Sequence, residues 1–169
     1  MSDGSASTQD DFFQSLLGDF LDESDQLLGS LGEHLLKLDE WTQSLEPDQP
    51  ARCDDDLMNE MFRAAHSLKG LSAMLGLSQI NSLTHRVENV FDAARNDQLT
   101  FSSESVELLF QSVDCLVALV DQLKDGTQGE VDCDAVIAGI EQILETAGAQ
   151  RVVTSQADAE AFLSEPEPS

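Results

Sequence analysis

The sequence of 169 residues is poor in proline and in aromatic residues. It has four prolines, eight phenylalanines, one tryptophan and no tyrosine. Because proline interrupts helices, its scarcity leaves room for long helical segments. Strands are not indicated either, since β-branched residues nowhere alternate with polar ones along the chain. Together with abundant leucine, these absences favour an all-α protein.

Positive charge is scarce as well. Eight Lys and Arg residues stand against 33 Asp and Glu, which gives a formal net charge of −25. Nucleic-acid binding through phosphate neutralisation needs the opposite sign, and so does attraction to an anionic membrane surface. The longest apolar run, Cys115 to Val120, is too short to span a bilayer, and the acidic N-terminus does not resemble a secretory signal. We therefore expect a cytoplasmic protein that binds neither nucleic acid nor membrane.

The sequence also has few residues of the kinds that hold metals or nucleotides. Cys53, Cys115 and Cys133 are an odd number of cysteines with no metal-type spacing, which fits a reducing compartment. We expect them to be small core residues. No phosphate-binding glycine loop with its lysine is present. We accordingly expect no metal, no bound cofactor and no ATP site within this chain.

Apolar residues recur at steps of three and four in five segments, which predicts five amphipathic helices. The predicted helices cover residues 10–45, 54–75, 78–95, 102–124 and 132–146. Short connections between the first four indicate an antiparallel four-helix bundle, with the fifth helix at its side, so one domain spans residues 10–147. We expect residues 1–9 to be disordered, and residues 148–169, acidic and ending in Glu-Pro repeats, to form a disordered tail or linker.

The acidic residues are unevenly distributed along the chain. Between Glu60 and Arg95 there are four basic and three acidic side chains, a net charge of +1. The rest of the chain has four basic and thirty acidic side chains, a net charge of −26. The second and third predicted helices thus form a near-neutral region on a strongly acidic molecule. Such a region is suited to receiving an anion.

His66 lies within this region, on the outward face of the second predicted helix. Helical spacing groups it with Arg63, Gly70 and Ala73, which are polar or small. Glycine inside a helix costs about 1 kcal/mol relative to alanine, so Gly70 makes sense where another protein surface must approach closely. Arg63 and Lys69, each three residues from His66, could attract a phosphoryl group. A solvated surface histidine without a function is the competing interpretation.

The residues around His66 resemble a known family. The run Ala-Ala-His-Ser-Leu-Lys-Gly at 64–70 resembles the phosphoacceptor signature of histidine phosphotransfer (HPt) domains. The longer run Phe-Arg-Ala-Ala-His-Ser-Leu-Lys-Gly at 62–70, followed by Gly-Leu-Ser-Gln at 76–79 and Thr-His-Arg-Val-Glu-Asn at 84–89, resembles most closely the N-terminal domain of CheA-type chemotaxis histidine kinases. The likeness covers about residues 10–147 and implies an HPt-like bundle.

This resemblance implies roles for four residues. His66 would accept a phosphoryl group on Nε2 from an ATP-bound kinase domain of the CheA type and pass it to an aspartate in a CheY- or CheB-like receiver domain of a response regulator. Glu88 would hydrogen-bond the other ring nitrogen and so orient His66, which leaves the Nε2 lone pair free. Lys69 would offset phosphoryl charge, and His85 would belong to the hydrogen-bond network. ATP would be used by the kinase domain.

The same resemblance places a partner-binding surface at Arg63, Gly70, Leu71 and Ala73. Leu71 departs from the family pattern, which often has a second glycine or small residue there. It is therefore either a core residue or an apolar contact for the partner. The isolated domain is expected to be a monomer.

Three other interpretations remain open at this point. The chain could be a stand-alone relay protein of a multistep phosphorelay, or a helical adaptor that binds partners through its acidic first helix. It could also hold a carboxylate-bridged metal site inside the bundle. Such sites use two Glu-x-x-His motifs, whereas this sequence has only the reversed order, from His85 to Glu88.

Overall fold

The computed structural model describes residues 3–46, 53–126 and 131–147. Within these ranges the chain forms five helices and no strand, which confirms the predicted all-α class. The first four helices are α1 (Asp3–Ser44), α2 (Asp55–Met74), α3 (Ser78–Arg95) and α4 (Ser103–Asp125). Residues 134–147 form the fifth. The acidic segment 148–169 and the proline-containing segment 47–52 lie outside the described residues.

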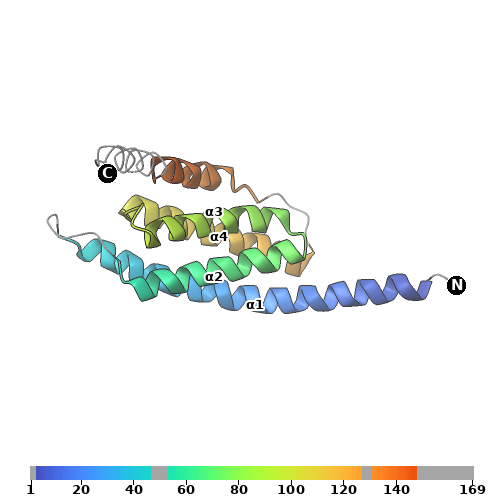
Figure 1. Cartoon of the computed structure of the whole chain (residues 1–169). Helices are drawn as coiled ribbons and strands as arrows, with labels where there is room; N and C mark the ends of the chain where they lie inside the picture. Colours follow the sequence, from blue (N-terminus) through green and yellow to red (C-terminus); the bar gives the residue numbers. More distant parts are fainter. Residues whose placement is uncertain (1–2, 47–52, 127–130, 148–169) are drawn as a thin grey trace, which may run out of the picture.

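The four labelled helices form an antiparallel bundle (Figure 1). Each helix packs against two others in the order α1, α2, α3, α4 and back to α1, so α1 and α3 lie on one diagonal and α2 and α4 on the other. The apolar stripes predicted from the sequence meet in the centre. The largest fully buried side chains include Phe20, Leu35, Leu38, Met61, Leu68, Leu83, Phe91, Leu109 and Leu116.

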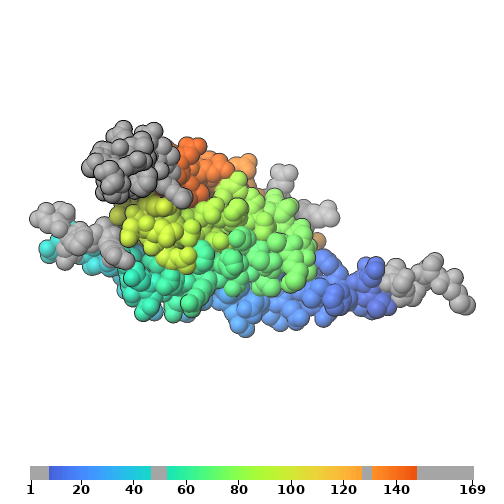
Figure 2. Space-filling model, viewed as in Figure 1, coloured from blue at the N-terminus to red at the C-terminus, as the bar shows by residue number. Residues whose placement is uncertain are grey.

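Helix α1 is longer than predicted. We expected residues 1–9 to be disordered, but the helix begins at Asp3 and has 42 residues, or about 63 Å at 1.5 Å per residue. This expectation was wrong from Asp3 onward, because a helix that already exists grows by one hydrogen bond per residue and no proline stops it. Its N-terminal part stands clear of the bundle (Figures 1 and 2). Phe13, which continues the apolar stripe of this helix, is therefore exposed, as is Phe12.

The fifth helix lies on α3 and α4, on the side of the bundle away from α1 (Figure 1). Val136 and Ile140 are buried in the common hydrophobic core. Arg86 of α3 donates from Nε to Glu141 Oε1 at 3.0 Å. These contacts confirm the prediction that a fifth helix packs at the side of the bundle. No helix in the described ranges is long and apolar enough to cross a membrane.

The cysteines lie in or beside the core, as expected for small apolar residues. Burial raises the pKa of the Cys133 thiol to about 12, and a hydrogen bond with Cys115 contributes to this rise. Burial likewise raises the pKa of Cys53 to about 11. Both thiols are therefore protonated and unreactive at neutral pH, because the thiolate is the nucleophilic form.

The ends of α2 fix the position of His66 relative to α3. At its start, the Asp54 carboxylate accepts a hydrogen bond from the Asp56 backbone N–H at 3.1 Å. At its end, Gly76 has a φ of +70°, and the Leu77 N–H bonds the Ser72 carbonyl at 2.9 Å. This left-handed stop turns the chain directly into α3. Ser78 is the first residue of α3, and Leu77 occupies the cap position.

Replacing Gly76 by alanine is expected to lower the free energy of unfolding by about 1 to 2 kcal/mol, the cost of a left-handed conformation for a residue with a Cβ. The added Cβ would meet no atom within 4 Å, so the effect comes from the backbone alone. Urea denaturation measures it. Gly29→Ala is the control: its site is open and helical, so stability should rise by up to about 1 kcal/mol. Equal effects in the two variants would contradict this account.

Candidate functional site

The candidate site is centred on His66, in the second half of α2. Its neighbours Ala65 and Leu68 point into the bundle and are buried. His66 lies on the opposite, outward side of the helix, and its side chain is 62% exposed. An imidazole in this position can reach a group presented by another protein.

Glu88 reaches the same place from the neighbouring helix α3. The residue is buried at 8% exposure, which is rare for a carboxylate without a partner. Its Oε2 lies 3.4 Å from Nδ1 of His66. The close packing of α2 on α3 therefore places the carboxylate behind the imidazole, as the resemblance implied for this pair.

Lys69 is the second partner of Glu88. Its ammonium donates a hydrogen bond to Oε1 at 3.0 Å and lies 2.8 Å from Oε2. The approach to Oε2 is not aligned for a hydrogen bond, and within the described part of the chain this buried atom has no other donor. A buried acceptor without a donor is costly. Oε2 is thus available to accept from the N–H of His66 Nδ1.

Asn81, which sequence reasoning left outside the site, ties Lys69 to α3. Its side-chain Nδ2 donates to the Lys69 carbonyl at 2.9 Å, and Ser72 Oγ donates to the same oxygen at 2.9 Å. The signal for Asn81 was present in the sequence, because it precedes Glu88 by seven residues and therefore shares its helix face. This hydrogen bond between Asn81 and Lys69 fixes the register of α2 along α3 at the site.

Phe62 packs against the hydrophobic core and also contacts His66. The two rings are stacked, with centroids 5.8 Å apart and planes at 17°. Arg95 lies over the Phe62 ring, with Cζ 4.0 Å from its centroid. The separation of four residues between Phe62 and His66 indicates such a contact on a helix, so this signal too was readable.

The remaining predicted residues lie around the imidazole at different depths. Arg63, Gly70 and Ala73 are exposed, whereas Leu71 is half-buried and packs against the hydrophobic core. His85 is exposed and makes no hydrogen bond or ion pair with another residue of the described ranges, so its place in a hydrogen-bond network stays a prediction.

An apolar groove runs beside His66, between α1 and α2. Leu71 forms part of it, which shows that this side chain contributes both to the core and to the surface. Met74, at its end, is 66% exposed. The lining residues are Leu16, Asp19, Phe20, Glu23, His66, Ser67, Gly70, Leu71, Met74 and Leu75.

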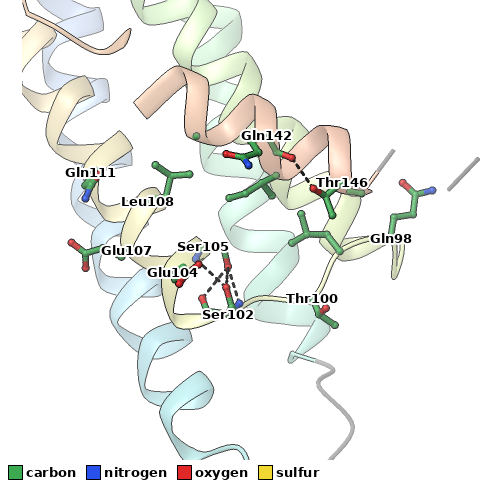
Figure 3. A pocket seen from close by; sticks show the side chains of 14 residues that line it. Gln98, Thr100, Ser102, Glu104, Ser105, Glu107, Leu108, Gln111, Gln142 and Thr146 are labelled. Atoms are coloured by element: carbon green, nitrogen blue, oxygen red, sulfur yellow. Dashed lines mark hydrogen bonds between the residues drawn. The ribbon is translucent and has the colours of Figure 1, made fainter. Parts of the chain in front are cut away.

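A separate pocket of about 500 Å³ lies between the start of α4 and the fifth helix (Figure 3). Its walls carry polar side chains such as Gln111, Gln142 and Thr146, and none of the candidate site residues. Among the residues that the structure describes, no group of three or more His, Cys, Asp and Glu side chains could hold a metal ion. We therefore place the candidate site at His66, Lys69 and Glu88 and not in this pocket.

The family to which this architecture and site belong is established by sequence comparison. The model of the Hpt domain family matches residues 15–126, a range that includes His66, Lys69 and Glu88. The chain therefore belongs to the Hpt domain family.

The relatives and a solved structure narrow the likeness to one kind of Hpt domain. The chain is 32% identical over 130 residues to the chemotaxis protein CheA of Listeria monocytogenes, covering 77% of this chain and 19% of that protein. It is 36% identical over 122 residues to CheA of Bacillus subtilis, covering 72% and 17%. The solution structure of the histidine phosphotransfer domain of CheA superposes with a TM-score of 0.61 at 33% identity, covering 76% of this chain and 90% of that one. The chain thus spans less than a fifth of these two CheA relatives.

Proposed function

We propose that His66 is the phosphoacceptor of a CheA-type chemotaxis phosphorelay. It takes a phosphoryl group from ATP bound to a kinase catalytic domain and passes it to an aspartate in the receiver domain of a response regulator. One observation carries the proposal: an imidazole that is 62% exposed has Nδ1 3.4 Å from Oε2 of a buried carboxylate, an oxygen that accepts no hydrogen bond from the described residues.

The chemistry follows from the two ring nitrogens. A neutral imidazole has one N–H, and a carboxylate acceptor beside Nδ1 favours the proton there. Nε2 then keeps its lone pair, on the edge of the ring away from Glu88. It attacks the γ-phosphorus of ATP, an N–P bond forms, the bond to the bridging oxygen breaks, and ADP leaves. The phosphorylated ring carries positive charge, which the Glu88 carboxylate stabilises.

The two basic residues near His66, Lys69 and Arg63, have different functions. Lys69 is bonded to Glu88 and compensates the charge of that buried carboxylate. Arg63 lies about one turn before His66 and has no ion-pair partner in the described part of the chain. Arg63 is therefore available to attract the incoming phosphate, a function that the helical spacing suggested for both Arg63 and Lys69. The near-neutral stretch from Glu60 to Arg95 reduces the repulsion that the phosphoryl group meets from the acidic chain, and Asp19 and Glu23 are the acidic residues that line the groove beside His66.

The proposal is tested by incubating the chain with a CheA-type catalytic domain and radiolabelled ATP. We expect up to one phosphoryl group per chain, in a linkage that is labile to acid and stable to base. Adding a CheY- or CheB-like receiver domain should remove the label from the chain. A chain that takes no label, or one whose label is stable to acid, would show that His66 is not a phosphoacceptor.

Gly70 provides a test of the partner surface that is separate from folding. A Cβ built on Gly70 meets no atom within 4 Å, so Gly70→Ala should keep the fold and raise stability by up to about 1 kcal/mol. The added methyl group lies one turn after His66, where a partner must approach, and should slow phosphoryl exchange several-fold. Thermal melting and the transfer rate measure the two effects. An unchanged transfer rate would remove Gly70 from the partner-binding surface.

A further inference from the structure

We propose that Phe62, covered by Arg95, is a positioning residue that fixes the plane of the His66 imidazole for phosphoryl transfer. The inference rests on the proposed function of His66 and adds residues that the phosphoacceptor, carboxylate and lysine arrangement does not include. Phe62 lies one turn before His66 on α2, and Arg95 is the last residue of α3.

The need for such a residue follows from the exposure of His66. Its contact with Glu88, from Nδ1 to Oε2, measures 3.4 Å, longer than the roughly 2.7–3.2 Å usual for N–H···O hydrogen bonds. With 62% of the side chain exposed, one long contact leaves the ring free to rotate about its bond to Cβ. A second contact, on the face of the ring, is required to hold Nδ1 toward the carboxylate and Nε2 outward.

Phe62 supplies that contact. The centroid distance of 5.8 Å and the interplanar angle of 17° correspond to offset stacking, which aromatic rings prefer over a face-to-face sandwich. Rotation of the imidazole out of this plane would lose the stack. Phe62 is itself anchored, because it is half-buried and packs against the hydrophobic core.

Arg95 packs over the ring of Phe62. Its Cζ lies 4.0 Å from the Phe62 centroid, well within the range of a cation–π contact. The guanidinium is held from α3, where Nη2 lies 3.2 Å from Asp92 Oδ1. A cation at the C-terminal end of α3 is also favoured by the helix dipole. Asp92, Arg95, Phe62 and His66 therefore form one continuous column from α3 to the phosphoacceptor.

The experiment compares Phe62→Leu with Phe62→Tyr in the whole chain, using single-turnover phosphorylation by a CheA-type catalytic domain. Leucine fills similar space without an aromatic face, and we expect phosphorylation to slow by about tenfold. Tyrosine keeps the face and should retain the wild-type rate. In the unphosphorylated protein, NMR should show the ring-current shift of the His66 ring protons in wild type and Phe62→Tyr, and its loss in Phe62→Leu.

Arg95→Gln tests the column without disturbing the core. We expect a smaller slowing, of about twofold to fivefold, with a partial loss of the His66 ring-current shift. Arg86→Gln is the matched control, because it also removes an arginine with an ion pair from α3, on the side that faces the fifth helix. It should leave both the rate and the His66 signals unchanged.

The outcomes separate this inference from the proposed function. If wild type is phosphorylated and Phe62→Leu reacts at the same rate, or Phe62→Tyr is as slow as Phe62→Leu, the positioning function is wrong. If wild type takes no phosphate, the function proposed for His66 fails, and the ring-current shifts alone decide whether Phe62 and Arg95 hold the imidazole.

Discussion

The His66→Gln variant is expected to take up no phosphoryl group from a CheA-type catalytic domain under conditions in which wild type is fully labelled. Glutamine has a side chain of comparable reach but no nucleophilic nitrogen, since its amide lone pair is delocalised. The exposed position of His66 means that the substitution removes no core packing, so the fold should be retained. Autoradiography after brief exposure to radiolabelled ATP, beside a thermal melt, measures both expectations.

His34→Gln is the control for this loss. His34 is one of three histidines in the sequence and lies between α1 and α2, 16% exposed, with Nε2 2.5 Å from Glu60 Oε2. It resembles His66 in having a carboxylate partner but differs in being largely covered, so an incoming phosphate cannot reach it. Labelling of His34→Gln should equal that of wild type. If His66→Gln were still labelled, another residue would be the phosphoacceptor and the proposal would be wrong.

Much of the fold could be predicted from the sequence, because the apolar residues that mark each helix recur along it at short, regular intervals. Apolar residues at steps of three and four placed five helices, and the boundaries of α3 were predicted at Ser78 and Arg95, where the structure has them. The start of α1 was misplaced because helix extension beyond the core depends on propagation and leaves no apolar pattern. The same overhang explains why Phe13, although in register with the stripe, is exposed.

At the site, the periodicity of a single helix carries part of the information, and the rest depends on how two helices pack together. The outward face of His66 follows from the periodicity of α2 alone. The bond from Lys69 to Glu88, by contrast, depends on the register of α2 against α3, which packing and the Asn81 bond set. For that reason the sequence did not reveal that Lys69 pairs with the carboxylate, and its role in offsetting phosphoryl charge stays a prediction. The contact of Arg95 with Phe62 depends on the same register.

Glu88→Gln is expected to slow phosphorylation of His66 by about 10² to 10⁴-fold while leaving His66 in place. The amide has the size of the carboxylate, but it can turn its NH₂ toward Nδ1 and so favour the tautomer with the proton on Nε2, where the nucleophilic lone pair is needed. Replacing the buried carboxylate of a serine-protease triad by an amide lowers turnover by about 10⁴ for this reason. The amide also lacks the charge that stabilises the phosphorylated, cationic ring.

Single-turnover kinetics with the catalytic domain measures this effect, and ¹⁵N NMR of the imidazole reports the tautomer directly. An amide in place of the Glu88 carboxylate would leave the Lys69 ammonium without its counter-charge and could lower stability. The double variant Glu88→Gln, Lys69→Met therefore tests whether phosphorylation is slow only because the protein is less stable. The double variant should regain stability but stay slow. Glu60→Gln, which removes the carboxylate from the other histidine pair, is the matched control and should react as wild type does. If Glu88→Gln reacts at the wild-type rate with an unchanged tautomer, the carboxylate behind His66 is structural and the ring owes its reactive form to its other contacts.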